Sequence, residues 1–283
     1  MHQPAPPPWH LQDDGAPAMP AAPAVQASPV QVLTADGQEQ RDDWIAAEVP
    51  VALVFNGLSH AVMMATPQDL AAFALGFALS EGIIDGPADC YGIEVQGGSG
   101  EAIEVQLDIA SRHFARLKDR RRSLAGRTGC GVCGIDSLQA LDLQPQPLVP
   151  PAWAQQITLA TLARAFSELP AHQPLNRQAG AIHAAAWARL DGGIAVAMED
   201  VGRHNALDKL LGHMAQQQLL GTPGFVAMTS RASYELVRKC ARLGLPVLAT
   251  ISAPTTLAIQ IARQARLQLY GLCRGSRAVR YAG

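Results

Sequence analysis

The stretch that decides the fold is residues 225–251, F-V-A-M-T-S-R-A-S-Y-E-L-V-R-K-C-A-R-L-G-L-P-V-L-A-T-I. Two short apolar runs, 225–229 and 247–251, enclose a segment over 232–243 whose apolar residues recur at helical spacing. Short apolar runs bounded by turn residues are typical of buried strands. A strand, a helix and a second strand in this order predict two parallel strands joined by a crossover helix.

The same alternation continues on both sides of this unit. We expect further strands over 193–198 and 267–272, and further helices over 159–169, 205–217 and 255–266. Residues 136–283 are therefore predicted to form an α/β domain, with a mixed, mainly parallel sheet covered by helices.

Residues 31–125 read differently and predict a small N-terminal α+β subdomain. Strands are expected over 48–55, 58–64, 91–96 and 102–107, the first two joined by a turn at Asn56-Gly57. Thr66, Pro67 and Asp69 have the spacing of a helix start, with Thr66 as the cap and Asp69 closing a capping box. That helix should continue to about Glu81.

Residues 1–30 are rich in Pro and Ala and are expected to form a disordered tail. The whole chain has 283 residues, a net charge of −2 and a pI near 6.4, which argues against a dedicated nucleic-acid binder. No apolar run reaches the ~18 residues of a membrane helix, and the first residues lack the pattern of a signal peptide. The odd count of 5 cysteines favours a reducing, cytoplasmic location.

The strongest chemical signal is G-R-T-G-C-G-V-C-G at residues 126–134, which places Cys130 and Cys133 at C-x-x-C spacing among 4 glycines. Glycine weakens both helices and strands, so residues 126–135 are expected to form a mobile loop that exposes two thiols. Arg127 and the Lys/Arg-rich segment at 112–122 would favour the thiolate form, although such a segment is also typical of a solvated helix face.

Three interpretations of this dithiol remain open from the residues alone. A structural zinc site needs four ligands, whereas only one Cys pair is present. A thioredoxin-like redox pair normally opens a helix after a strand, without glycines on every side. The third interpretation is sulfur transfer, in which one thiolate carries a sulfur atom as a persulfide and the second assists its release by thiol–disulfide exchange.

A second candidate site lies at the predicted carboxyl edge of the sheet, where ligands of such folds bind. Polar loops follow the strands there and supply hydroxyl groups and guanidinium groups, which suit phosphate. We expect a ligand with phosphate groups, such as a nucleotide, although Ser and Thr can also simply cap helices. The candidate binding residues are Arg203, His204, Ser230, Arg231, Leu272, Cys273, Arg274, Gly275, Ser276 and Arg277.

The chain resembles the formate dehydrogenase accessory sulfurtransferase (FdhD) family. The resemblance is carried, in family order, by E-V-P-V-A-L-V-F-N-G at 48–57, M-M-A-T-P-Q-D-L at 63–70, A-L-G-F-A-L-S-E-G-I-I at 74–84, G-R-T-G-C-G-V-C-G at 126–134, H-A-A-A-W at 183–187, E-D-V-G-R-H-N-A-L-D-K-L-L-G at 199–212 and S-R-A-S-Y-E at 230–235. These stretches cover most of the chain from residue 48 onward.

The resemblance implies a cytoplasmic sulfur carrier with a main domain similar to cytidine deaminases. It implies that Cys130 carries a persulfide received from a cysteine desulfurase and that Cys133 supports its transfer. The acceptor would be the molybdenum cofactor in its bis-molybdopterin guanine dinucleotide form, bound partly by residues 272–277, before insertion into formate dehydrogenase. Recognition of the guanine nucleotide moiety is part of this expectation, and a homodimer is compatible with it.

Two departures from related patterns bear on these expectations. The family commonly has Cys-Lys-Pro-Gly-Arg where this chain has Cys273-Arg274-Gly275-Ser276-Arg277, so the outer basic residues are kept while the backbone path differs. A zinc deaminase needs H-x-E followed by P-C-x-x-C. Here Ala184 and Ala185 follow His183 and the Cys pair lies upstream, so deamination is not expected.

Overall fold

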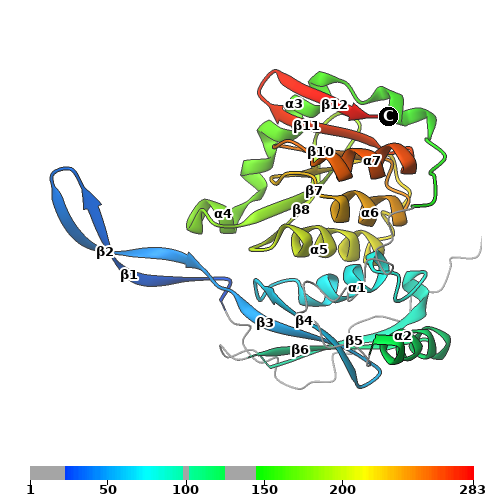
Figure 1. Cartoon of the computed structure of the whole chain (residues 1–283). Coiled ribbons are helices and arrows are strands. Elements are labelled where there is room, and N and C mark those ends of the chain that lie inside the picture. The colour runs from blue at the N-terminus through cyan, green and yellow to red at the C-terminus, as the bar shows by residue number, and fades with distance from the viewer. Residues whose placement is uncertain (1–22, 98–101, 125–144) are drawn as a thin grey trace, which may run out of the picture.

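A computed structural model describes residues 23–97, 102–124 and 145–283, without the side chains of 120–124. Strands over these residues form three sheets, of 2, 4 and 6 strands. Figure 1 shows a small unit around the 4-stranded sheet, a larger unit around the 6-stranded sheet, and a two-stranded arm.

The small unit is built from β3 (Val49–Phe55), β4 (Leu58–Ala65), β5 (Cys90–Gln96) and β6 (Ile103–Ile109), in the order β4-β3-β6-β5. The expected hairpin at Asn56-Gly57 is confirmed, and β3 pairs in parallel with β6 on its other side. Helix α1 (Leu70–Ser80) packs its buried residues against this sheet. A short 3-10 helix η1 (Pro87–Asp89) leads into β5, and α2 (Ser111–Leu124) follows β6.

The predicted capping box of α1 is wrong. The residue that caps the helix is Asp69, in a left-handed conformation and with no side-chain cap hydrogen bond. Thr66 is fully buried, and its hydroxyl oxygen accepts a hydrogen bond from Val201 N instead. Tertiary contact with the large unit therefore takes the group that local pattern had assigned to the helix.

The large unit is a sheet in the order β12-β11-β10-β9-β7-β8. The parallel pairs are β9–β10 and β10–β11, and the pairs β11–β12, β7–β9 and β7–β8 are antiparallel. The expectation of a mainly parallel sheet was therefore wrong, because the sequence pattern missed two strands. Alanine-rich β7 lacks a strong strand pattern, and β12 is an edge strand whose residues are mostly only partly buried. The strands are β7 (His183–Ala188), β8 (Ile194–Asp200), β9 (Phe225–Met228), β10 (Val247–Thr250), β11 (Gln268–Arg274) and β12 (Arg277–Ala282).

Helices cover both faces of this sheet (Figure 1). Successive residues of β9 alternate between two cores, with Val226 and Met228 in one and Phe225 and Ala227 in the other. The first core is closed by α5 (Arg203–Gln216), α6 (Tyr234–Arg242) and α7 (Thr256–Ala265), and the second by α3 (Leu159–Glu168). The shorter elements η3 (Ala152–Gln156), η4 (Leu169–His172) and α4 (Pro174–Ala179) flank α3.

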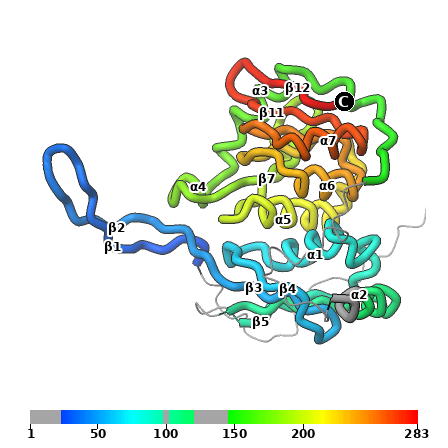
Figure 2. The backbone as a smooth tube through the Cα atoms, in the orientation of Figure 1, coloured from blue at the N-terminus to red at the C-terminus, as the bar shows by residue number. Residues whose placement is uncertain are grey.

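The two units meet along α1 and α5, which run close together in Figure 2. A Cβ atom on Gly76 would lie 1.8 Å from Asp208 O, and one on Gly212 would lie 1.8 Å from Ala72 O. Only glycine allows two backbones to approach this closely.

A buried ionic network lies at the end of the same interface. Lys239 Nζ of α6 is 2.8 Å from Asp208 Oδ2 of α5 and 2.8 Å from Glu81 Oε1, the residue that follows α1. Ser80 Oγ donates to Asp208 Oδ1 at 2.7 Å, and Arg238 Nη2 donates to Glu81 Oε2 at 2.6 Å. Charged groups of both units therefore satisfy one another away from water.

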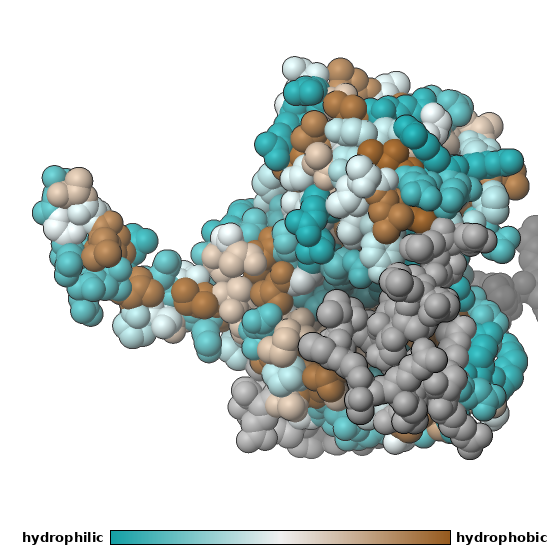
Figure 3. Space-filling view, viewed as in Figure 1, coloured by the Kyte–Doolittle hydropathy of each residue, from teal (hydrophilic) through white to brown (hydrophobic). Residues whose placement is uncertain are grey.

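The arm consists of β1 (Val25–Thr34) and β2 (Gly37–Ala46), paired antiparallel along their whole length. It projects from the body, and Figure 3 shows hydrophobic surface along it. Leu33, Trp44 and Ile45, which belong to the strands of the arm, are exposed. The expectation that residues 1–30 lack order was therefore wrong from Val25 onward. These residues are ordered because β1 pairs with β2, and the composition of residues 1–30 alone does not reveal this pairing. Residues 1–22 lie outside the described part of the chain.

Candidate functional site

The predicted binding residues lie along one edge of the 6-stranded sheet, with 203–204 after β8 and 272–277 at the end of β11, and three strands lie between β8 and β11. Strands β8, β9, β10 and β11 run in the same direction, so their carboxyl ends lie together. The amino ends of β7 and β12 join them, since His183 pairs with Asp200 and Arg274 pairs with Arg277. We call this the cationic edge, formed by His183, residues 200–204, 229–235, 251–255 and 272–277.

Hydrogen bonds tie three loops of the cationic edge to one another. Ser252 N donates to Ser230 O at 3.4 Å, and Leu272 N donates to Ser252 O at 3.3 Å. Arg274 Nε donates to Ile251 O at 2.9 Å. The loops after β9, β10 and β11 are therefore held as one surface.

The turn between β11 and β12 presents the segment 272–277 to solvent. Left-handed backbone occurs at Leu272, with φ 52°, and at Gly275, with φ 54°. Arg274, Gly275, Ser276 and Arg277 are exposed. Cys273 differs, because it is buried and burial raises the pKa of its thiol to about 11. Its side chain belongs to the core, and the ligand-facing groups of this segment are the two arginines, the serine hydroxyl and the backbone.

A second group of cations stands at the start of α5. Arg203 is the first residue of the helix after the cap Gly202, and its Nε is buried without a hydrogen-bond partner among the described residues. Burial lowers the pKa of the neighbouring His183, and the charges of Arg203 and then of His204 add to this effect. The three side chains therefore form a cluster with spare hydrogen-bond donors, which favours an anionic ligand.

His204 is held by residues that sequence reasoning did not select. Its Nε2 lies 2.8 Å from Glu235 Oε2 and 3.3 Å from Ser233 Oγ, both at the start of α6. The hydrogen bond from His204 lowers the pKa of Glu235, and the charges of His204, Arg203 and Lys239 outweigh the opposing effect of burial. The sequence signal that could have pointed to Glu235 is a carboxylate in the first turn of the helix that follows Ser230-Arg231.

Other polar residues of the stretch 199–209 serve the framework. Glu199 accepts backbone hydrogen bonds from Leu175 N at 2.9 Å and Asn176 N at 2.8 Å, at the start of α4. Asn205 Nδ2 donates to Met64 O at 2.7 Å and to Asp200 Oδ1 at 3.0 Å. Within this stretch, Arg203 and His204 are therefore the polar side chains available to bind a ligand at the cationic edge.

Comparison with known proteins shows the family to which the chain belongs. The model of the FdhD/NarQ family matches residues 46–283. The chain belongs to the FdhD/NarQ family. It is 59% identical over 243 residues to the sulfur carrier protein FdhD of Chromobacterium violaceum, covering 85% of this chain and 90% of that protein. It is 55% identical over 249 residues to the sulfur carrier protein FdhD of Burkholderia mallei, covering 87% and 91%.

A solved structure shows the same fold. The crystal structure of a formate dehydrogenase accessory protein from Desulfotalea psychrophila superposes with a TM-score of 0.71, over 92% of this chain and 98% of that one. The two sequences share 23% identity, so this match speaks for the architecture alone. The mixed α/β fold is thus found in a second protein.

The two cysteines that this FdhD/NarQ chain places in the C-x-x-C motif, Cys130 and Cys133, lie outside the described residues, in the segment 125–144. Its flanks are described. On one side, α2 is fixed by ion pairs of Arg112 with Asp89 and of Arg116 with Asp85. On the other, Leu148 N donates to Ala265 O at the end of α7. Since α7 runs antiparallel to the strands, this flank lies at the edge opposite the cationic edge.

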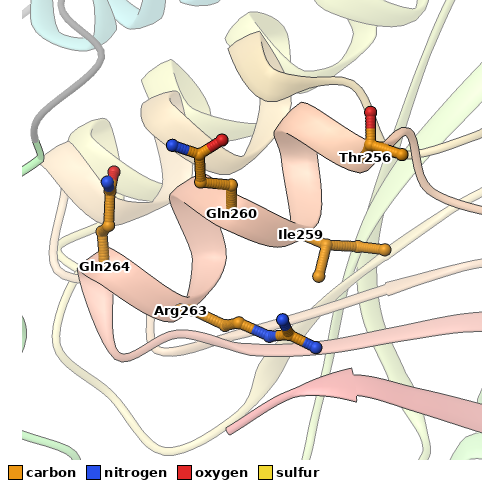
Figure 4. A pocket seen from close by; sticks show the side chains of 5 residues that line it. All are labelled: Thr256, Ile259, Gln260, Arg263 and Gln264. Carbon is orange, nitrogen blue, oxygen red and sulfur yellow. The ribbon is translucent and has the colours of Figure 1, made fainter.

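Three further features of the described residues complete the picture. A shallow groove of about 540 Å³ runs along the outer face of α7, lined by Thr256, Ile259, Gln260, Arg263 and Gln264 (Figure 4). The groove contains none of the predicted site residues.

No helix of the described chain is long and apolar enough to cross a membrane. Within residues 23–97, 102–124 and 145–283, no group of three or more His, Cys, Asp and Glu residues is placed to hold a metal ion.

Proposed function

We propose that this chain is a sulfur carrier that matures formate dehydrogenase, and that it acts as a sulfurtransferase. The observation that carries the proposal is its 59% identity, over 85% of its length, to a protein named as a sulfur carrier. The cysteine pair at 130 and 133 supplies thiols for the chemistry, and the cationic edge supplies a surface for an anionic acceptor.

The proposed chemistry uses two displacement steps. The Cys130 thiolate attacks the outer sulfur of a persulfide on a cysteine desulfurase, which leaves the desulfurase thiolate and a Cys130 persulfide. In the second step the Cys133 thiolate attacks the Cys130 sulfur, so that a Cys130–Cys133 disulfide forms and the outer sulfur leaves as sulfide. A thiol reductant then reopens the disulfide for the next cycle.

The acceptor is proposed to be the molybdenum cofactor as bis-molybdopterin guanine dinucleotide, bound as substrate. Its pyrophosphate groups suit Arg203, His204, Arg231, Arg274 and Arg277, together with the hydroxyls of Ser230 and Ser276. Guanidinium groups bind phosphate oxygens by paired, charge-assisted hydrogen bonds. Recognition of the guanine base is part of the same proposal.

Three further points follow the family resemblance and are proposals as well. The large unit would be a cytidine-deaminase-like domain that has lost the zinc chemistry, since Ala185 stands where a deaminase needs glutamate. The protein would act in the cytoplasm, beside the desulfurase and the apo-enzyme. Two copies would form a homodimer.

A mass measurement tests the carrier function directly. Incubation with a cysteine desulfurase and cysteine should add the mass of one sulfur atom to the chain, and a reductant should remove it. Cys130→Ala should abolish the gain, whereas Cys240→Ala should keep it because Cys240 is fully buried. A reversible disulfide without added sulfur would instead indicate a dithiol oxidoreductase. About one zinc per chain, lost on mutation of Cys130 and Cys133, would indicate a zinc-stabilised binding module.

A further inference from the structure

The starting point is the contact between the first turns of α5 and α6 at the cationic edge. His204 Nε2 lies 2.8 Å from Glu235 Oε2, and each side chain is 25% exposed. Ser233, the residue that caps α6, adds its hydroxyl at 3.3 Å. One nitrogen of the imidazole is therefore committed to α6.

The other ring nitrogen is not used in this way. No described residue exchanges a hydrogen bond with His204 Nδ1. When Nε2 donates its proton to a carboxylate, that bond fixes the orientation of the ring, and the neighbouring negative charge favours a second proton on Nδ1, which makes this nitrogen a hydrogen-bond donor. The free nitrogen is then the one that can meet a ligand.

A carboxylate beside an anion site needs an explanation. An opposite charge would attract a phosphate, whereas the Glu235 carboxylate repels it. Glu235 is ionised at neutral pH, because the hydrogen bond from His204 and the surrounding cations lower its pKa despite burial. Its presence at this edge is accounted for when it acts on His204 and not on the ligand.

We infer that Glu235 is a positioning residue that holds the His204 ring by Nε2 and supports a ring protonated at both nitrogens, so that Nδ1–H is presented as a donor to a phosphate oxygen of a nucleoside diphosphate at the cationic edge. The inference rests on the proposed function for the nature of the ligand. It adds a residue of α6 to the site and gives His204 a defined orientation. Ser233 supports the same ring from the cap of the helix.

The test measures GDP binding by calorimetry for the wild type, Glu235→Ala, Glu235→Gln, His204→Ala and the double variant Glu235→Ala/His204→Ala. We expect Glu235→Ala to weaken GDP binding about tenfold, although it removes a negative charge from an anion site. Glu235→Gln should retain more affinity, since its amide oxygen still accepts from Nε2. The double variant should bind no more weakly than His204→Ala.

A matched control comes from the opposite end of the same sheet. Glu168 Oε1 pairs with Arg164 Nε at 2.8 Å, and its side chain is 36% exposed. Its Oε2 accepts a hydrogen bond from Ile194 N, which places it at the amino end of β8. Glu168→Gln should leave GDP affinity unchanged. The inference is overturned if Glu235→Ala binds GDP as tightly as the wild type or more tightly, or if the losses in the double variant add.

A second readout separates this inference from the proposed function. Nitrogen NMR of the histidine rings should show His204 protonated at Nε2 in the wild type and a changed ring signal in Glu235→Ala. If the wild type does not bind GDP, the proposed acceptor is wrong while the ring signal still decides the role of Glu235. An identical His204 signal in both proteins would overturn that role.

Discussion

Lys209 Nζ lies 2.8 Å from Asp200 Oδ2, and both side chains are fully buried. The ammonium group also donates to Thr66 O at 3.0 Å and to Glu199 O at 3.2 Å. The same carboxylate oxygen accepts from Thr66 N at 3.0 Å. This pair therefore fastens the end of β4 in the small unit to the end of β8, where the cationic edge begins.

Breaking this pair should destabilise the protein strongly. Lys209→Met leaves Asp200 buried with its charge partner removed, and such losses cost about 3–5 kcal/mol. Arg164→Met serves as the control, because Arg164 and its partners Asp191 and Glu168 are solvent-exposed, and its loss should lower stability far less than the loss of Lys209. Urea unfolding of the three proteins measures the difference. Equal losses for both variants would show that the buried pair has no special role.

Substitution of either glycine at the α1–α5 contact should also destabilise the protein strongly. Gly76→Ala and Gly212→Ala each place a methyl group against a backbone carbonyl, so the helices must separate and lose packing at a cost of about 3 kcal/mol or more. At Gly86 an added Cβ meets nothing within 4 Å, so Gly86→Ala should change the melting temperature little. A melting temperature of Gly76→Ala close to that of Gly86→Ala would contradict the close approach.

Acid should reveal the contribution of Glu81. Burial opposes ionisation of this carboxyl, but Lys239 and Arg238 outweigh it and lower its pKa from 4.5 to about 2. A carboxyl group whose pKa is lower in the folded protein than in the unfolded chain stabilises the fold at any pH above its unfolded-state pKa. This stabilisation is lost as the pH falls through the folded-state pKa. Glu81→Gln should therefore be less stable than the wild type at pH 7, by at most about 3 kcal/mol, and the gap should close between pH 4.5 and about 2.

The control for this prediction is Glu39→Gln, on the exposed arm. It should track the wild type across the whole pH range in chemical unfolding. A gap between Glu81→Gln and the wild type that stays constant from pH 7 to pH 2.5 would refute the assignment.

The three buried cysteines Cys90, Cys240 and Cys273 should resist alkylation in the native protein. Burial raises the pKa of Cys90 to about 11, of Cys240 to about 12 and of Cys273 to about 11, so little thiolate forms at these positions. Iodoacetamide at pH 8 should leave all three unmodified in the native protein and modify them after denaturation, as read by peptide mass spectrometry. Rapid modification of Cys273 in the native state would mean that the β11–β12 turn opens in solution.

The arginines of the cationic edge should govern binding of the nucleotide probe. Arg203→Met and Arg274→Met should each weaken GDP binding about tenfold, since each removes a charge-assisted contact to phosphate. Arg189→Met is the control, because Arg189 is exposed and follows β7 at the opposite edge. GDP affinity that falls equally in all three variants would indicate a general charge effect and no site at the cationic edge.

The sequence by itself determined the elements whose pattern is local. The strand–helix–strand unit over 225–251, the Asn56-Gly57 hairpin and the helix from Leu70 were all predictable, because apolar spacing and turn residues encode them. So was the placement of Arg203, Ser230 and residues 272–277 at one edge, which follows from the common direction of the strands they end.

Only the tertiary structure decided what depends on distant partners. Alanine-rich β7 and the edge strand β12 become strands because neighbouring strands pair with them, and β1 is ordered by β2. Thr66 does not cap α1 because its polar groups bind the large unit instead. Its amide donates to Asp200, its hydroxyl oxygen accepts from Val201 N and its carbonyl oxygen accepts from Lys209. Glu235 joins His204 through the packing of two helices, 31 residues apart in sequence. Burial and charge pairing act through space, so no local pattern could reveal them.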